Sequence, residues 1–267
     1  MIEFAAAALL PFYADIDVFV LIMVRIVGFL LLVPVLAGMS VPAAARIAIA
    51  LGLAAIVFFS GTVGEIEYTP NMVGYFNLVV IELVAGIVMG FVVYSTFAII
   101  FLLGELIDRQ IGFAMASVFD PVLQLQVPVM GNLIYFTMMA IFIVSGGLTS
   151  FIGALILSFE LAPIGQLLVL ENNVLLLYIL GTFTGFFLLA VQFALPIAGS
   201  IFIIDIMLGI LVKAVPQMNV FVVGLPLKVM LGLALVMMLT PIFSIYYFIL
   251  YEMAAEALMA VIGGISP

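Results

Sequence analysis

Six long apolar runs make up most of this chain and limit what it can fold into. A helix needs about 20 apolar residues to span the hydrocarbon core of a bilayer, whereas a membrane β-strand needs about ten residues of alternating hydrophobicity. The runs are much longer than such strands: Val18–Gly38, Ile47–Val63, Met72–Leu103, Asn132–Ser158, Val174–Val212 and Val229–Tyr251. They predict an all-α integral membrane protein with about six long apolar segments.

The composition supports this prediction and excludes several functions. Hydrophobic residues make up 69% of the chain and charged residues 7%, whereas soluble domains contain about 25% charged residues. The chain has no histidine and no cysteine, so we expect no cofactor, no metal site and no disulfide. The net charge of −9 argues against nucleic acid as a partner. No basic residue precedes Arg25, so we expect no signal peptide.

The few basic residues predict the orientation of the spans. Positive side chains in the short loops of membrane proteins are enriched on the cytoplasmic side. Here Arg46, Arg109, Lys213 and Lys228 lie in alternate connections, and the other connections carry acidic residues only. We therefore expect these four residues on the cytoplasmic side and both termini outside.

Two runs are too long for one straight span. Met72–Leu103 would extend about 48 Å and Val174–Val212 about 58 Å, against a hydrocarbon core of about 30 Å. Because proline interrupts helical hydrogen bonding, we expect a sharp kink or a bent-back hairpin at Pro196, and Pro241 to divide the last run. Broken helices in a bilayer must be buried in protein or line a cavity, so these breaks indicate a complex or a pore.

The central stretch "GELIDRQIGFAMASVFDP", Gly104–Pro121, interrupts the apolar pattern with a mixture of charges, glycine and aromatics. We interpret it as a loop with helical ends. Glu105 and Arg109 are spaced i, i+4 in the favourable order, and Asp120 followed by Pro121 is typical of a helix start. On these grounds alone, an ordinary re-entrant or interfacial connection is the more common explanation.

Three ionisable residues fall inside apolar runs: Arg25, Glu82 and Asp205. Charged groups in spanning segments are costly, so they face protein or water. They could form a proton or ion path, but a path needs several titratable groups along one route, and these are scattered. We favour ion pairs, within the chain or across a subunit contact, whose partners the sequence does not identify.

The stretch "KAVPQMNVFVVGLPLK", residues 213–228, is the second unusual loop. Its two prolines and Gly224 are incompatible with one continuous helix. Gln217 and Asn219 can hydrogen-bond to the backbone of a partner. A plain cytoplasmic connector whose lysines set the orientation explains the stretch equally well.

Catalytic motifs are absent: there is no G-x-S-x-G, no H-E-x-x-H and no phosphate-binding loop. Carboxylates occur in pairs, as at Glu105 and Asp108, but no neighbouring motif would place a substrate or metal beside them. We therefore expect no enzyme. An intramembrane enzyme that uses Glu105, Asp108 or Asp120 remains one alternative, and a secondary transporter with broken helices is the other.

A series of motifs, in a characteristic order along nearly the whole chain, indicates a resemblance to a known family. An arginine, two prolines and a second arginine come first, at Arg25, Pro34, Pro42 and Arg46. "IELVAGIVMGF", the central stretch, "SGG", "SF", "FALPIAG" and "KAVPQMNVFVVGLPLK" follow in order. The chain resembles the FliR family, the R subunit of the flagellar type III export gate, which has relatives in virulence injectisomes. It departs from many members in lacking a histidine after the paired glycines. The Pro-Gln-Met-Asn loop favours the flagellar branch.

The resemblance implies one membrane-embedded domain over residues 1–267, a P-subunit-like portion followed by a Q-subunit-like hairpin, with bent helical hairpins throughout. Its partners would be the FliP-like and FliQ-like subunits, a FlhB-like subunit, membrane lipid and exported unfolded proteins. It would lie in the bacterial inner membrane at the flagellar basal body, partly on the periplasmic side. Arg25, Glu82 and Asp205 would then serve in pairs between subunits.

The resemblance also gives the central loop, residues 104–130, a role. In this family the loop projects into the channel and helps to plug it. By position, the plug residues here are Gly112, Phe113, Met115, Phe119, Asp120 and Pro121. Glu105 and Arg109 would anchor the base of the plug. The second loop, residues 213–228, would dock on neighbouring subunits through Lys213, Gln217, Asn219 and Lys228.

Overall fold

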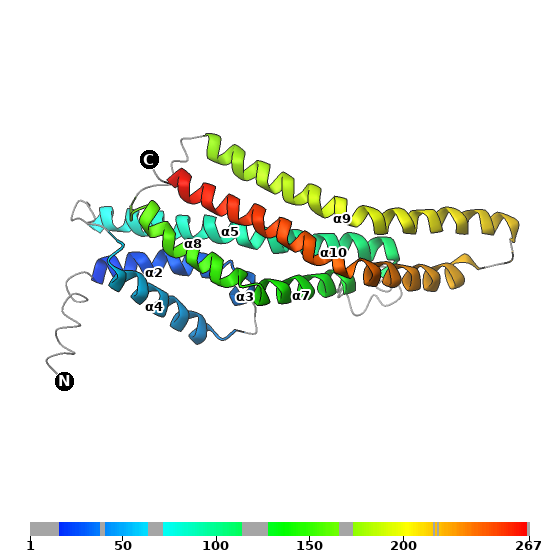
Figure 1. The fold of residues 1–267 in the computed structure, drawn as a ribbon, viewed down its shortest axis with the longest axis horizontal. Helices are drawn as coiled ribbons and strands as arrows, with labels where there is room; N and C mark the ends of the chain where they lie inside the picture. The colour runs from blue at the N-terminus through cyan, green and yellow to red at the C-terminus, as the bar shows by residue number, and fades with distance from the viewer. Residues whose placement is uncertain are drawn as a thin grey trace. The chain divides into compact units, whose positions relative to one another are not determined.

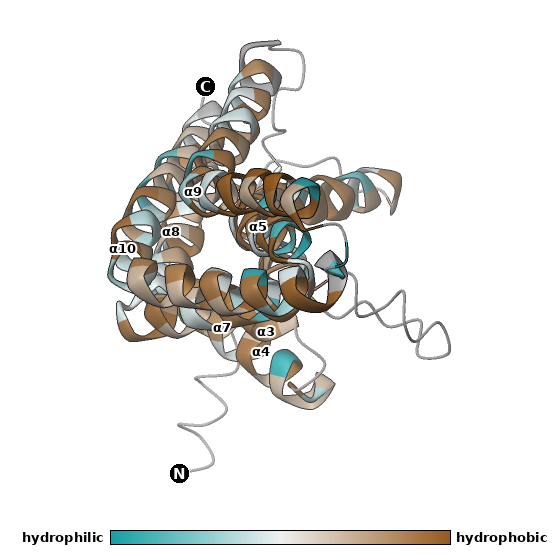
Figure 2. Ribbon diagram, turned by 90° about the vertical axis from the view of Figure 1, so that its right-hand side faces the viewer, coloured by the Kyte–Doolittle hydropathy of each residue, from teal (hydrophilic) through white to brown (hydrophobic). Residues whose placement is uncertain are grey.

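The computed structural model describes residues 16–37, 41–63, 72–113, 128–165, 173–215, 217 and 219–265. Within these ranges every regular element is a helix (Figure 1). The helices are α2 (Ile16–Leu30), α3 (Pro34–Ala37), α4 (Ala43–Ser60), α5 (Met72–Ile111), α7 (Val129–Val144), α8 (Gly147–Leu161), α9 (Asn173–Ala214) and α10 (Val220–Ile265). The all-α prediction is confirmed, and apolar residues predominate along the helices (Figure 2).

Four of the described helices, α4, α5, α9 and α10, are long and apolar enough to cross a membrane, and α7 and α8 together make up a fifth candidate. The protein is an integral membrane protein, but the expectation of about six spans was slightly too high. Within the described residues α2 ends at Leu30 and has 15 residues, fewer than the roughly 17 that a span requires.

Neither Pro196 nor Pro241 ends its helix, so a bent-back hairpin at Pro196 and a division of the last run at Pro241 are wrong. α9 contains Pro196 and α10 contains Pro226 and Pro241, yet both are continuous. α9 changes direction part-way along its length (Figure 1), so it is a bent helix rather than a bent-back hairpin. A helix in lipid tolerates proline when side chains and small adjustments satisfy the freed backbone groups, and a break would expose more of them.

The two loops are shorter than the sequence suggested. α5 continues to Ile111, so Gly104–Ile111 is helical and only residues 112–128 separate α5 from α7. α10 begins at Val220 and includes Gly224, so the second connection covers residues 215–219. The run expected over Asn132–Ser158 is instead interrupted between α7 and α8, where Gly146 has a φ of +79°, a conformation that glycine adopts readily.

The chain divides into two compact units. The first contains residues 1–95, 148–180 and 254–267, and the second residues 96–147 and 181–253. In the first unit α2 packs closely on α5, where a Cβ added at Gly86 would overlap the Arg25 carbonyl oxygen, and one added at Gly90 would lie 2.7 Å from the Phe29 oxygen. These two glycines, four residues apart, let the helix backbones approach as small residues do in membrane helix pairs. α4 also packs beside α2, through an edge-to-face contact between Phe19 and Phe58.

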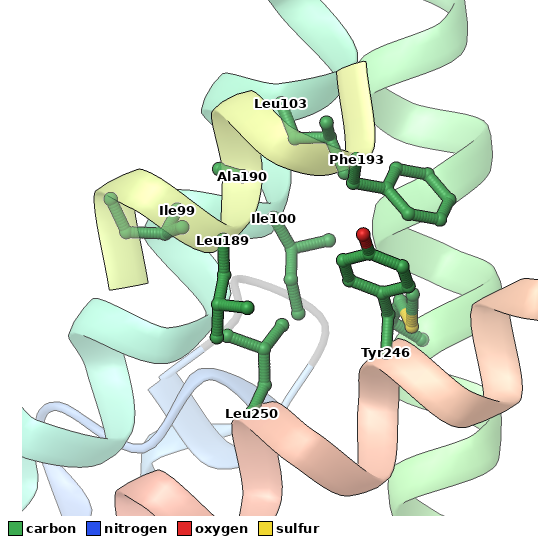
Figure 3. A pocket seen from close by; sticks show the side chains of 9 residues that line it. Ile99, Ile100, Leu103, Leu189, Ala190, Phe193, Tyr246 and Leu250 are labelled. Atoms are coloured by element: carbon green, nitrogen blue, oxygen red, sulfur yellow. The ribbon is translucent and has the colours of Figure 1, made fainter. Parts of the chain in front are cut away.

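The second unit is organised by aromatic contacts. Phe97 of α5 packs edge-to-face on Phe142 of α7, with ring centroids 5.2 Å apart, and Phe193 of α9 contacts Tyr246 of α10 at 4.3 Å. The Tyr247 and Ser145 hydroxyls lie 2.6 Å apart, so α10 holds the chain at the interruption that follows α7. One small apolar void, bordered by Phe193 and Tyr246 (Figure 3), has room for at most about one water molecule.

Candidate functional site

The last turns of α5 lead into the central loop. They carry two charged residues that are exposed and one that is buried. Glu105 and Arg109 form the expected i, i+4 ion pair, with 2.7 Å between Oε1 and Nη2. Their side chains are 36% and 66% exposed. Solvent and lipid headgroups can therefore screen the pair, and pairs of this kind contribute about 0.3–0.5 kcal/mol.

Asp108, in the same turn, is buried, with 4% of its surface exposed. Its Oδ1 accepts the Met130 backbone N–H at 2.9 Å, and its Oδ2 accepts that of Gly131 at 3.1 Å. Both donors belong to the first turn of α7, where backbone N–H groups have no partner within the helix. One carboxyl group of α5 thus satisfies two of the open donors of α7.

A glycine contact explains how Asp108 reaches α7. Gly104 lies one turn before Asp108, and a Cβ added to it would overlap the backbone of Gly131. Because neither glycine has a side chain, the two helix backbones can approach closely. At such a distance the short aspartate side chain reaches the backbone of the neighbouring helix.

The predicted plug residues lie beyond this base. α5 is closed by Gly112, which has a φ of +97° and whose N–H donates to the Asp108 carbonyl at 3.1 Å. Phe113 follows and is partly buried. The other four plug candidates fall outside the described residues: Met115, Phe119, Asp120 and Pro121.

The charges inside the apolar runs form pairs within this chain. Arg25 of α2 is 1% exposed and Glu82 of α5 is 0% exposed. Arg25 donates from Nε and Nη2 to the two oxygens of Glu82, at 2.5 and 3.0 Å. It also lies 4.4 Å from the centroid of the Phe159 ring, a cation–π geometry that suits a guanidinium group.

This buried pair also holds the C-terminal end of α8. Arg25 Nη1 donates to the carbonyls of Ser158 at 3.1 Å and Ala162 at 3.0 Å. Glu82 accepts the N–H of Gly165 at 3.0 Å. Arginine therefore binds carbonyls at the helix end, of which that of Ser158 also accepts the Ala162 N–H at 3.0 Å. Glutamate binds the turn that follows, so that α2, α5 and α8 are joined at one point.

The remaining candidates lie on α9 and α10. Asp205 pairs with Lys228, and their side chains are 40% and 23% exposed. Lys213, Gln217 and Asn219 are exposed. The Asn219 carbonyl accepts the Val222 N–H at 3.1 Å, so this asparagine stands immediately before α10, where its residue type is favoured.

Sequence reasoning missed the contacts of Asp108. From the sequence, Asp108 could be considered only as half of a carboxylate pair. The two N–H groups that Asp108 binds belong to the backbone 22 and 23 residues away, so no sequence motif indicates them. A glycine four residues before the acid was the one available signal. Among the described residues, no group of three or more histidine, cysteine, aspartate or glutamate side chains could hold a metal ion.

Comparison with known proteins identifies the family. The family described as "Bacterial export proteins, family 1" matches residues 16–253. The flagellar biosynthetic protein FliR of Bacillus subtilis is 33% identical over 79% of this chain and 81% of its own length. FliR of Escherichia coli is 28% identical over 83% of this chain and 84% of its own. The secretion system apparatus protein SsaT of Salmonella typhimurium is 28% identical over 60% of this chain and 61% of its own.

The matched region covers most of the chain, including α5, the central loop, and the Arg25–Glu82 and Asp205–Lys228 ion pairs. This chain therefore belongs to the family of bacterial export proteins that contains the flagellar biosynthetic protein FliR. The resemblance deduced from its motifs is confirmed.

Proposed function

We propose that this protein is a channel subunit of a type III protein export gate and that it helps to form and close the conducting pore. The relatives named flagellar biosynthetic protein and secretion system apparatus protein support the export role. FliP-like, FliQ-like and FlhB-like subunits are its partners, and unfolded proteins are its cargo. The gate lies in the inner membrane, and this chain acts as a structural subunit rather than an enzyme.

The observation that carries this proposal is the arrangement at the base of the central loop. α5 and α7 approach each other at Gly104 and Gly131, and Asp108 joins the two helices there. A loop that blocks a pore needs a fixed base and a part that can move aside. Apolar side chains in the moving part exclude ions by preventing water from filling the constriction. Phe113, Met115 and Phe119 supply those side chains, and Gly112 supplies conformational freedom.

Removal of the loop tests the plug. The complex is expressed from its native operon, and residues 112–119 are deleted from this chain. We expect the membrane to become permeable to a small hydrophilic dye while the complex can still be purified intact. A second variant with Phe113, Met115 and Phe119 replaced by serine keeps the loop length, and it should leak as well. An assembled deletion complex with no leak would contradict the plug.

Co-purification tests the subunit role separately. A tagged chain should be recovered with two other small, very hydrophobic proteins, and the mass of the intact complex should account for one copy of this chain. Asn219→Ala should reduce recovery if residues 213–228 dock on neighbouring subunits. Recovery of a lone, functional monomer would favour a secondary transporter instead.

A further inference from the structure

The start of α8 follows an interruption in the fifth candidate span. α7 has 16 residues and α8 has 15, and each is shorter than the roughly 17 residues that a span requires. Together they are apolar enough to cross a membrane as a broken span or to enter it as a re-entrant loop. In both arrangements the interruption, at residues 145–146, lies within the thickness of the bilayer.

Two exposed side chains shortly after this interruption, Thr149 and Ser150, carry hydroxyl groups. We call these two residues the hydroxyl pair. Neither hydroxyl has a hydrogen-bond partner among the described residues. In contrast, Thr137 of α7 donates to the Leu133 carbonyl at 2.7 Å, four residues earlier. Other hydroxyls of the described helices bond in the same way to a carbonyl three or four residues earlier, at Ser95, Ser158, Ser200, Thr240 and Ser244.

The interruption explains why the hydroxyl pair lacks such a bond. A serine or threonine that bonds to its own helix uses a carbonyl of the preceding turn. α8 begins at Gly147, so Thr149 and Ser150 belong to its first turn. The residue before α8, Gly146, has a φ of +79°, which is outside the helical range. No complete helical turn therefore precedes the hydroxyl pair, and its hydrogen-bond partner must come from outside the described part of the chain.

Water fits this role better than lipid or another helix. Hydrocarbon forms no hydrogen bonds, so a hydroxyl group placed in it loses the bonds that it forms in water. Interrupted helices at membrane depth occur where protein buries them or where they line a water-filled cavity. The described part of this chain leaves the hydroxyl pair exposed, and the carbonyls of a neighbouring helix are already bonded within that helix. Water can donate to each hydroxyl and accept from it.

We propose that the hydroxyl pair faces the water-filled part of the conducting path in the assembled gate. The inference rests on the proposed function, which supplies such a path. It does not depend on the central loop, because Thr149 and Ser150 belong to α8. The beginning of α8 is then part of the wall along which an exported chain passes.

Single cysteines test this placement, because the chain has no cysteine of its own. Ser150→Cys and Thr149→Cys are introduced separately into the complex expressed from its native operon. A charged methanethiosulfonate that does not cross membranes is added on both sides of the membrane, and mass spectrometry of this chain measures the modification. The reagent reacts with the thiolate, which forms in water and not in hydrocarbon.

Phe136→Cys is the matched control, because Phe136 lies on α7 and is 65% exposed but apolar. We expect both cysteines of the hydroxyl pair to react at least about tenfold faster than the control in the assembled complex. Modification of Ser150→Cys as slow as that of Phe136→Cys would overturn the proposal, because lipid or another subunit would then cover the position. If Ser150→Cys does not assemble, Thr149→Cys decides the question.

Stalled cargo separates the conducting path from the outer surface of the gate. An exported protein fused to a folded domain that is too wide to pass should occupy the path and slow the modification of Ser150→Cys severalfold. An unchanged rate would place the hydroxyl pair outside the path and overturn the proposal. If the cysteines are unreactive in a complex that assembles and exports, this inference fails and the proposed function stands. If the chain is recovered alone, the proposed function fails and the inference fails with it.

Discussion

α5 contributes to two sites, each of which combines a glycine with a buried acidic residue four positions away. The two sites compensate the charge of the buried carboxylate in different ways. In the first unit, Glu82 precedes Gly86 by four residues, and in the second, Gly104 precedes Asp108 by four. Each glycine brings a neighbouring helix backbone within contact of α5. Each acid is buried on the same face of α5 as its glycine, because residues four apart are neighbours on a helix surface.

The two sites differ in where the positive charge comes from. Glu82 pairs with Arg25 beside the C-terminal end of α8, where the helix dipole is negative and the arginine supplies the positive charge. Asp108 contacts the N-terminus of α7, where two open N–H groups and the helix dipole provide it. At Asp108 a helix N-terminus thus takes the place that an arginine takes at Glu82.

Removal of one member of the Arg25–Glu82 pair should have the largest effect on stability. Glu82→Gln leaves the guanidinium group buried with no opposite charge, which typically costs about 3–5 kcal/mol. We expect a strong drop in the thermal unfolding midpoint of the purified complex, or no assembly. Asp205→Asn is the control, because its pair is partly exposed and should cost about 1 kcal/mol or less. Equal effects from the two variants would contradict the comparison.

Glycine substitutions should have intermediate effects and should affect both sites alike. A Cβ at Gly86 or Gly104 would overlap backbone atoms of the neighbouring helix. Gly86→Ala and Gly104→Ala must therefore push helices apart, at a cost of about 1–3 kcal/mol. Gly52→Ala is the matched control, since a Cβ added there meets nothing within 4 Å. Unfolding of the purified complex measures all three, and a stable Gly86→Ala would show that the helices can separate freely.

The class of fold and the charged residues in apolar runs could be predicted from the sequence. The contact partners of those residues could not. Apolar runs cannot be covered by so few polar residues in water, so the membrane and the helices followed directly. Arg25 and Glu82 were identified as costly in an apolar run, but they are 57 residues apart, and such a pairing has no local pattern. The contacts of Asp108 were harder still, because backbone atoms of any residue type can donate the hydrogen bonds.

Helix ends and continuity were the weakest predictions. Proline lowers helix propensity in water, where a broken helix can bond to solvent. In lipid a break leaves backbone groups without partners, and this cost keeps α9 and α10 continuous through Pro196 and Pro241. The helical end expected at Glu105 and Arg109 is present, and α5 extends beyond it to Ile111. Propensities derived from soluble helices therefore place breaks too often in such a chain.

The smallest effect should come from the exposed pair on the same turn as Asp108. Glu105→Gln removes one charge of an i, i+4 pair, which contributes about 0.3–0.5 kcal/mol and less at high salt because ions screen exposed charges. The unfolding midpoint of the purified complex should change little, whereas Asp108→Asn should lower it clearly, since it weakens the hydrogen bonds of two buried donors. Both variants change a carboxylate to an amide three residues apart, so they differ mainly in burial and in which helix is contacted. If Glu105→Gln lowered the midpoint as much as Asp108→Asn, the charge of the α5 end, rather than the bond between α5 and α7, would be what stabilises the base of the loop.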